Sequence, residues 1–201
     1  MIILYKTKIM LSELIDNTKT DKNTSHSYIY TYERLFHSRK YENNRILEIG
    51  IGEPKNNKQN GGSIKLWYDY FPNSIIYGLD IHDISNINDD IQNKDRIKLY
   101  TSVDAYSDNF VENMFIQSNT TFDILIDDGP HTLESMKIFI HKYLPLLNSR
   151  GIMVIEDIPD MDWIQILRNC VPAELRDSIE VVDLRYIKNR WDDIMMVIHK
   201  P

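Results

Sequence analysis

Short apolar runs that alternate with segments of helical spacing constrain the fold of this chain more than any other feature. The runs are rich in β-branched side chains and are bounded by polar or turn residues; they cover 45–49, 74–79, 122–126 and 151–155, with a weaker one at 96–100. Their length and composition favour buried strands of a parallel sheet. The segments with helical spacing cover 63–70, 107–117, 133–147 and 162–170. This alternation predicts βαβ units and a Rossmann-like, doubly wound α/β sheet.

The C-terminal part follows a different pattern. Two strand-like runs, 178–184 and 193–200, are joined only by the polar stretch 185–192. That connection is too short for a crossover helix, so we expect the two runs to pair antiparallel as a hairpin. The full prediction is a seven-stranded sheet whose C-terminal end is an antiparallel hairpin.

The first 40 residues lack the alternation of strands and helices. About 8–38 reads as two helices that lie against the sheet or over its ligand-binding edge. We therefore divide the chain into an N-terminal helical segment or lid, 1–40, and a Rossmann-like region, 41–201. A length of 201 residues suits one domain overall.

Charge and composition narrow the class of protein. The formal net charge of -7 disfavours broad attraction to nucleic acid or to an anionic membrane. No apolar run approaches the roughly 20 residues that cross a bilayer. The apolar start is broken by Lys6 and Lys8, and no small-residue cleavage site follows it. Cys170 is the only cysteine, which excludes an intramolecular disulfide framework. We expect a soluble, cytoplasmic protein and leave open whether it forms a homo-oligomer.

The turn after the first strand predicts a ligand site. Glu48, Gly50 and Gly52 form an acidic-x-G-x-G pattern, in which glycines let the backbone approach a ligand, although a tight structural turn would use the same residues. Asp80 ends the second strand, where an acid can accept hydrogen bonds from ribose hydroxyls. Lys55 replaces the third glycine of the dinucleotide fingerprint, which disfavours NAD or FAD. A carboxylate in the turn would repel pyrophosphate but suit the ammonium and sulfonium of S-adenosylmethionine.

Acids at the ends of two later strands predict a metal site. Asp127 and Asp128 end the fourth strand, and Glu156 and Asp157 end the fifth. Neighbouring strands lie about 4.8 Å apart, so these carboxylates would crowd one edge and need protons or a cation. Hard oxygen ligands favour Mg²⁺, with Ca²⁺ or Mn²⁺ as alternatives. We assign Asp128, Glu156 and Asp157 to the metal and expect Asp127 to orient a neighbour or contact the cofactor. Helix capping and solvent exposure would be the alternative for these acids.

His131 follows Asp128 at the start of the next predicted helix. A helix N-terminus disfavours the imidazolium, and a neutral imidazole beside a metal can act as a general base. Capping of that helix is the structural alternative. A divalent cation lowers the pKa of a bound hydroxyl, and chelation of two neighbouring hydroxyls would align the attacking oxygen. The predicted chemistry is O-methylation of a vicinal diol or catechol, with His131 and Asp128 as catalytic residues.

In combination, these segments resemble the class I S-adenosylmethionine-dependent methyltransferases, and among them the metal-dependent sugar O-methyltransferases of macrolide antibiotic pathways. The resemblance is carried, in chain order, by Thr20-Asp21-Lys22 with His26 and Tyr28, then 46–52, 61–80, 127–131 and 155–157. It implies that Glu48, Gly50 and Gly52 flank the amino-acid part of the cofactor and that Asp80 binds its ribose. Asp104, after the third strand, sits where such enzymes contact adenine, although a helix N-cap explains it equally well.

The resemblance also implies roles for the later acids. Asp128 would be a metal ligand, His131 the catalytic histidine, and the pair Glu156-Asp157 would complete the metal site. His26 would belong to a lid over the cofactor, although helix packing explains it equally well. Two positions depart from the branch: Asn23 stands where it usually has glycine, and Pro130 where it often has serine. We also expect the additional N-terminal domain of that branch to be absent.

The function we expect is metal-dependent O-methylation of a sugar hydroxyl, with a nucleotide sugar or glycan precursor as the small-molecule acceptor. A catechol-type or other small-molecule methyltransferase would use the same metal site. An RNA methyltransferase would contact phosphate and base through the hairpin turn with Arg185, Lys188, Arg190 and Trp191, which the net acidity disfavours. A cofactor-binding module without turnover is a non-enzymatic alternative.

Overall fold

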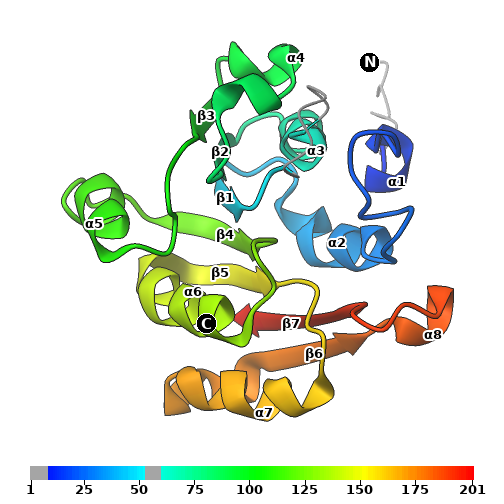
Figure 1. Cartoon of the computed structure of the whole chain (residues 1–201), viewed down its shortest axis with the longest axis vertical. Helices are drawn as coiled ribbons and strands as arrows, with labels where there is room; N and C mark the ends of the chain where they lie inside the picture. The colour runs from blue at the N-terminus through cyan, green and yellow to red at the C-terminus, as the bar shows by residue number, and fades with distance from the viewer. Residues whose placement is uncertain (1–8, 53–59) are drawn as a thin grey trace, which may run out of the picture.

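The apolar runs of the sequence form the strands of one sheet in the computed structural model, which describes residues 9–52 and 60–201 (Figure 1). The strands are β1 Arg45–Ile49, β2 Ile75–Leu79, β3 Ile97–Tyr100, β4 Phe122–Asp127, β5 Leu147–Ile155, β6 Ile179–Asp183 and β7 Ile194–His199. Their order is β3-β2-β1-β4-β5-β7-β6; β1 to β5 pair parallel, and β7 pairs antiparallel with both β5 and β6. The predicted Rossmann-like sheet and its antiparallel hairpin are confirmed. Lys55, which stands in place of the third glycine of the dinucleotide fingerprint, lies outside the described residues, as does the start of the chain through residue 8.

Helices cover both faces of the sheet. They are α1 Leu11–Leu14, α2 Ile29–Phe36, α3 Gly62–Tyr70, α4 Asp89–Gln92, α5 Asp108–Val111, α6 Leu133–Tyr143, α7 Met161–Cys170 and α8 Arg185–Lys188. Short 3-10 turns lie at His37–Arg39, Ile84–Asn86, Leu144–Leu146 and Ala173–Ser178, and a π-helical turn at Glu112–Ile116 continues α5. The helix predicted to reach residue 147 ends at Tyr143, because Pro145 lacks an amide hydrogen and cannot continue it.

The N-terminal segment is less helical than predicted. Within its described part, residues 9–40, only the four residues of α1 and the eight of α2 are α-helical, and 15–28 between them is irregular. Polar side chains in this stretch bind the backbone instead: the Asp16 carboxylate accepts the Thr18 amide at 2.9 Å. The Asp21 carbonyl accepts the amides of Thr24, Ser25 and His26. The side-chain bond of Asp16 competes with helix formation, whereas the backbone bonds to Asp21 close a single turn that does not continue as a helix.

Strand alternation divides the core into two layers. Ile46, Ile126 and Val154 pack in the layer that contains α2 and α3, whereas Leu125 and Ile155 pack in the layer that contains α6. Successive side chains of a strand point to opposite faces. Each acid at a strand end therefore points to the same face of the sheet as the apolar residue two positions before it.

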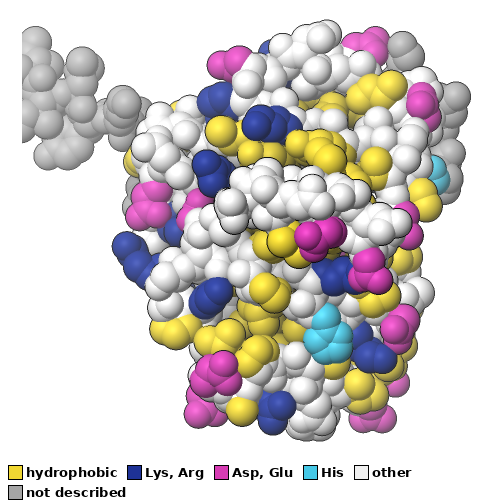
Figure 2. All heavy atoms as spheres, turned by 90° about the vertical axis from the view of Figure 1, so that its left-hand side faces the viewer, with side chains coloured by type: hydrophobic (Ala, Val, Ile, Leu, Met, Phe, Trp, Pro, Cys, Tyr) yellow, Lys and Arg dark blue, Asp and Glu magenta, His cyan; other side chains and the backbone are white. Residues whose placement is uncertain are grey.

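The described part of the chain contains no helix with the length and apolarity that crossing a bilayer requires. On the face that carries α5, described acidic and basic side chains are interspersed (Figure 2). That face thus presents no broad basic surface, among the described residues, of the kind that follows a nucleic-acid backbone.

Candidate active site

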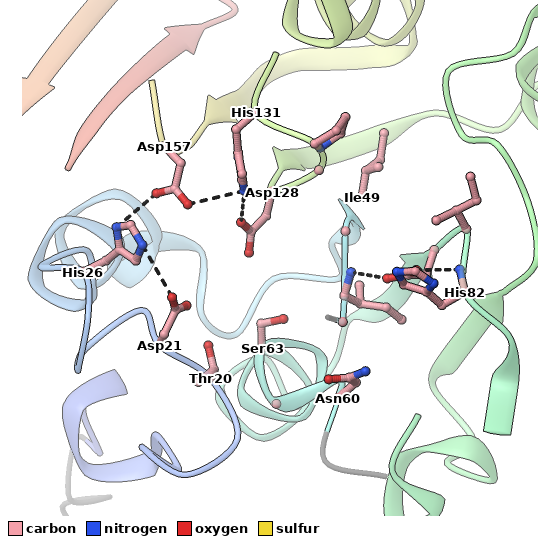
Figure 3. Close-up of a pocket in the computed structure, with 18 of the residues that line it drawn as sticks. Thr20, Asp21, His26, Ile49, Asn60, Ser63, His82, Asp128, His131 and Asp157 are labelled. Atoms are coloured by element: carbon pink, nitrogen blue, oxygen red, sulfur yellow. Dashed lines mark hydrogen bonds and ion pairs between the residues drawn. The ribbon is translucent and has the colours of Figure 1, made fainter. Parts of the chain in front are cut away.

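A pocket of about 850 Å³ opens beyond the carboxyl ends of the central strands (Figure 3). This is the edge at which open α/β sheets bind ligands. The predicted site residues that line it are His26, Gly50, Gly52, Asp80, Asp104, Asp128, His131 and Asp157. Three others, Glu48, Asp127 and Glu156, are buried and stand behind the lining.

Gly50, in the turn after β1, lines the pocket and also packs closely against the turn after β4. Gly50 has a φ of +81°, and a Cβ there would lie 1.9 Å from the carbonyl oxygen of Asp128. The Asp128 amide donates to the Ile49 carbonyl at 2.9 Å, so the turns after β1 and β4 are held together. A side chain at Gly50 would push these turns apart and displace Asp128.

Asp80 links two of the turns that line the pocket. Its two carboxylate oxygens accept the amide of Ile51 at 2.9 Å and the amide of His82 at 2.7 Å. Burial raises the pKa of Asp80. The carboxylate thus joins the turns after β1 and β2, and it lines the pocket where we predicted a ribose contact.

Asp104 does not cap a helix. Ser107 is the N-cap of α5, its hydroxyl accepting the Phe110 amide at 3.3 Å. Asp104 accepts the Tyr106 amide at 2.9 Å and lines the pocket. The capping alternative is therefore wrong, and the adenine contact stays a prediction.

Asp127 lies on the opposite side of the sheet from the other acids. It follows Leu125 by two positions and so faces the α6 layer, where the Tyr106 hydroxyl donates to it. Burial raises the pKa of Asp127 to about 7. Tyr106 lines the pocket and Asp127 does not, so Asp127 meets the pocket through this hydrogen bond, and its predicted contact with the cofactor stays a prediction.

The raised pKa of Asp127 predicts a pH dependence of stability. Between the free-acid value of 3.8 and about 7, the folded chain keeps a proton that the unfolded chain has lost. The contribution of Asp127 to the free energy of unfolding should therefore fall as pH rises through this window, by an amount on the order of a few kcal/mol. Urea unfolding at several pH values should show Asp127→Asn gaining stability relative to wild type as pH rises. The exposed-site control Glu174→Gln should show a constant difference, and a constant difference for Asp127→Asn would contradict the prediction.

A lysine sits among the remaining acids. The Lys22 ammonium lies 2.8 Å from Asp128 Oδ2 and 3.2 Å from Glu48 Oε1, and it also donates to Glu156. Burial alone would lower the pKa of Lys22, but the three carboxylates raise it well above its ordinary value. We predicted that these acids need a cation, and the chain itself supplies one.

The placement of Glu48 differs from the prediction that it lies beside the ligand. Glu48 follows Ile46 by two positions, so strand alternation turns it toward α2 and α3. There the Trp67 indole donates to it at 2.7 Å. Burial raises the pKa of Glu48. Glu48 thus forms an ion pair with Lys22 and accepts a hydrogen bond from Trp67 of α3. It is not part of the pocket lining.

His131, Asp128 and Asp157 converge at the pocket surface. His131 Nε2 lies 3.5 Å from Asp157 Oδ2 and 3.8 Å from Asp128 Oδ1, and the side chains point toward one another (Figure 3). The N-cap of α6 is Thr132, whose hydroxyl accepts the Ser135 amide at 3.1 Å, so His131 does not cap that helix. Burial raises the pKa of Asp157 to about 8.

Both His131 and Asp157 have left-handed backbone conformations. Their φ angles are +52° and +53°. Residues other than glycine adopt this region at a cost of about 1 kcal/mol or more, and such strain gathers at functional sites. The two residues whose side chains lie 3.5 Å apart in the pocket thus both have a strained backbone conformation.

The irregular N-terminal stretch covers these acids. His26 Nδ1 lies 3.0 Å from Asp157 Oδ1 and 3.3 Å from Asp193 Oδ1. The Tyr28 hydroxyl donates to Asp157. Burial lowers the pKa of His26. The opposite nitrogen of His26 faces Asp21 at 3.4 Å, so the ring bridges the N-terminal segment and the strand ends (Figure 3).

Comparison with known proteins places this geometry in a family, although no family model matches the chain. The chain is 32% identical over 154 residues to a demethylmacrocin O-methyltransferase of Streptomyces fradiae, covering 76% of this chain. It is equally similar, 32% over 154 residues, to a mycinamicin VI 2''-O-methyltransferase of Micromonospora griseorubida, again over 76% of this chain. The crystal structure of MycE methyltransferase in complex with Mg, SAH and mycinamycin VI superimposes with a TM-score of 0.75 at 25% identity, covering 96% of this chain and 54% of that one. The chain belongs to the class I methyltransferases.

The predicted resemblance to macrolide-sugar O-methyltransferases is confirmed by these relatives. This class I methyltransferase chain spans 37% of the length of both curated relatives.

Sequence reasoning missed several residues of this site. Lys22 was seen only as part of a motif, because a lysine in a polar stretch is ordinarily exposed and nothing local marks it as buried. Tyr32, whose hydroxyl donates to Glu156, and Asp193, which accepts the Ser27 amide at 3.1 Å, were not singled out. Asp193 does carry a signal, since an acid begins the last strand at the same sheet edge.

Proposed function

We propose that this chain transfers a methyl group from S-adenosylmethionine to a hydroxyl of a sugar, carried by a nucleotide sugar or a glycan precursor, with the help of a divalent cation. The observation that carries the proposal is the convergence of His131, Asp128 and Asp157 in the pocket, with ligand atoms within 4.8 Å of one another. A base and oxygen ligands thereby stand beside the glycine turn of Gly50, which the pocket also includes.

The pocket offers a place for each part of the cofactor. The turn of Gly50 and Gly52 would receive its amino-acid end, Asp80 its ribose, and Asp104 its adenine. The N-terminal segment 1–40, whose described residues 17–21, 24 and 26 line the same pocket, would act as the lid. His26 supports this role because it joins that segment to Asp157.

The acids fit a hard divalent ion. Asp128 and Asp157 present carboxylate oxygens to the pocket, and Glu156 stands behind them with hydrogen bonds from Lys22 and Tyr32. A bound Mg²⁺ would lower the pKa of a coordinated hydroxyl. His131 would accept the hydroxyl proton at Nε2 as the acceptor oxygen attacks the methyl carbon and the carbon–sulfur bond breaks.

The hairpin turn lacks free cations for RNA among its described residues. The Lys188 ammonium donates to the backbone carbonyls of Asn23, Thr24 and His26. Arg185 pairs with Asp183 and Arg190 with Asp192, each at 2.7 Å. These internal contacts favour the small-molecule acceptor over the RNA alternative.

Cofactor binding gives a direct test. S-adenosylmethionine at about 100 times its Kd should raise the unfolding free energy by about 2.7 kcal/mol and the Tm by roughly 5–10 °C. Differential scanning fluorimetry with NAD as the matched ligand should show no shift. A shift with NAD and none with S-adenosylmethionine would exclude the proposed function. Transfer of a labelled methyl group to a panel of nucleotide sugars, with a catechol in parallel, would then identify the acceptor.

A further inference from the structure

The connection between β6 and β7, residues 184–193, meets the irregular stretch 15–28 beside the pocket. Because β7 pairs antiparallel with β5, this connection lies at the sheet edge where β4 and β5 end (Figure 1). It contains α8, whose last residue is Lys188, and Asn189, whose left-handed backbone with a φ of +56° ends that helix. Two segments from opposite ends of the chain are thus brought together at the ligand-binding edge.

Lys188 joins the two segments through a single ammonium group. Its Nζ donates to the backbone carbonyls of Asn23 at 2.6 Å and Thr24 at 3.1 Å, and also to that of His26. An ammonium has three N–H donors, so these contacts use all of them. Hydrogen bonds from a charged donor are roughly twice as strong as those between neutral groups. Lys188 therefore fastens an irregular stretch to a connection that is anchored in the sheet.

Two further contacts continue this junction along the chain. The Ser27 amide donates to Asp193 Oδ1 at 3.1 Å, and the Tyr28 hydroxyl donates to the Asp192 carbonyl at 3.2 Å. Asp193 is fully buried at the start of β7. These contacts hold residues 27 and 28, and Lys188 extends the junction to the preceding residues, 23–26.

Both segments line one end of the pocket. The stretch 15–28 and the connection contribute Asp21, Thr24 and His26 on one side and Arg190 and Asp192 on the other.

Figure 3 shows that this end also holds the proposed base. His26 lies on the same side as Asp157 and His131, whereas His82 lies on the opposite side (Figure 3). His82 is hydrogen-bonded through its amide to Asp80, the residue expected to bind the ribose. The cofactor would therefore extend toward His82, and the end beside His131 is left for the acceptor.

We propose that Lys188 is a positioning residue for the acceptor: by fastening 23–26 to the β6–β7 connection, it makes the two segments one wall at the reacting end of the pocket. This inference rests on the proposed function, because it assigns the acceptor to the end that holds His131. Lys188 is not itself part of the pocket lining, so it acts through Thr24 and His26, which are. Its loss should weaken acceptor binding more than it slows methyl transfer or weakens cofactor binding.

Hydrogen exchange measures the fastening without turnover. In Lys188→Met, the amides of Thr24, Ser25 and His26, which bond to the Asp21 carbonyl, should exchange about 10–100-fold faster than in the wild type. Lys188→Arg, which keeps the charge and the N–H donors, should stay close to the wild type. Lys137→Met is the matched control, because Lys137 makes an ion pair with Glu134 within α6 and should leave these amides unchanged.

Steady-state kinetics then test the role in the reaction. The acceptor is the compound that is methylated best in the panel of nucleotide sugars and a catechol. Lys188→Met should raise its KM about 10-fold while changing kcat and the Kd for S-adenosylmethionine by less than about 3-fold. Lys188→Arg should restore most of the KM. If Lys188→Met fails to fold, Lys188→Gln, which also removes the charge, takes its place.

Other outcomes would overturn the proposal. Unchanged exchange in Lys188→Met would show that Lys188 does not fasten the stretch, whichever acceptor is used. Faster exchange with an unchanged acceptor KM would reduce Lys188 to a structural contact. Methylation of the catechol alone would refute the proposed sugar function, whereas a raised KM for the catechol in Lys188→Met would still support the role of Lys188.

Discussion

Replacing His131 with asparagine is expected to lower kcat by about 10²–10⁴-fold and to leave the Kd for S-adenosylmethionine nearly unchanged. The substitution removes the proposed base, which faces Asp128 and Asp157. Asparagine is the suitable replacement, because it tolerates the left-handed backbone of this position, where φ is +52°. Alanine would remove the imidazole and also add backbone strain, so the two effects on kcat could not be separated.

Steady-state kinetics with a labelled methyl donor would measure the effect. His141 on the exposed side of α6 provides the matched control, since His141→Asn removes an imidazole far from the pocket lining. An unaltered kcat in His131→Asn would show that His131 does not act as the general base. A raised Kd for the cofactor with unaltered kcat would assign it to binding.

Removal of divalent ions is expected to have an effect of similar size. Treatment with EDTA should lower turnover by about 10³-fold, because a metal supplies several kcal/mol of charge stabilisation in the transition state. Added Mg²⁺ should restore activity, and Asp128→Asn should not be restored at the same Mg²⁺ concentration. EDTA already saturated with Mg²⁺ controls for chelator effects on the protein. Turnover that is indifferent to EDTA would remove the metal from the mechanism.

The strands could be predicted because their signal is local. Buried strands in a parallel sheet read as short apolar runs, and β1 is found at the predicted residues, Arg45–Ile49. The neighbour relation of β4 and β5, which brings Asp128 and Glu156 to one ammonium, followed from the fold class. The glycine turn and the acids at the strand ends could be predicted because they directly follow these apolar runs in the sequence.

The directions of the acidic side chains were harder to predict. Strand alternation sends Glu48 to one face and Asp127 to the other, and the parity rule was available from the apolar residues before them. What the sequence could not supply is the partner: Lys22 and Glu156 are separated by 134 positions, and their contact depends on where an irregular segment folds back. Helical periodicity has no bearing on such a segment.

The left-handed backbone of His131 and Asp157 has a consequence for engineering. A directed-evolution campaign that rewarded heat tolerance alone would be drawn to these two positions, since glycine would relax both. Each such gain would discard a group that the proposed chemistry needs. Thermostable variants that keep their activity are better sought in loops remote from the strand ends.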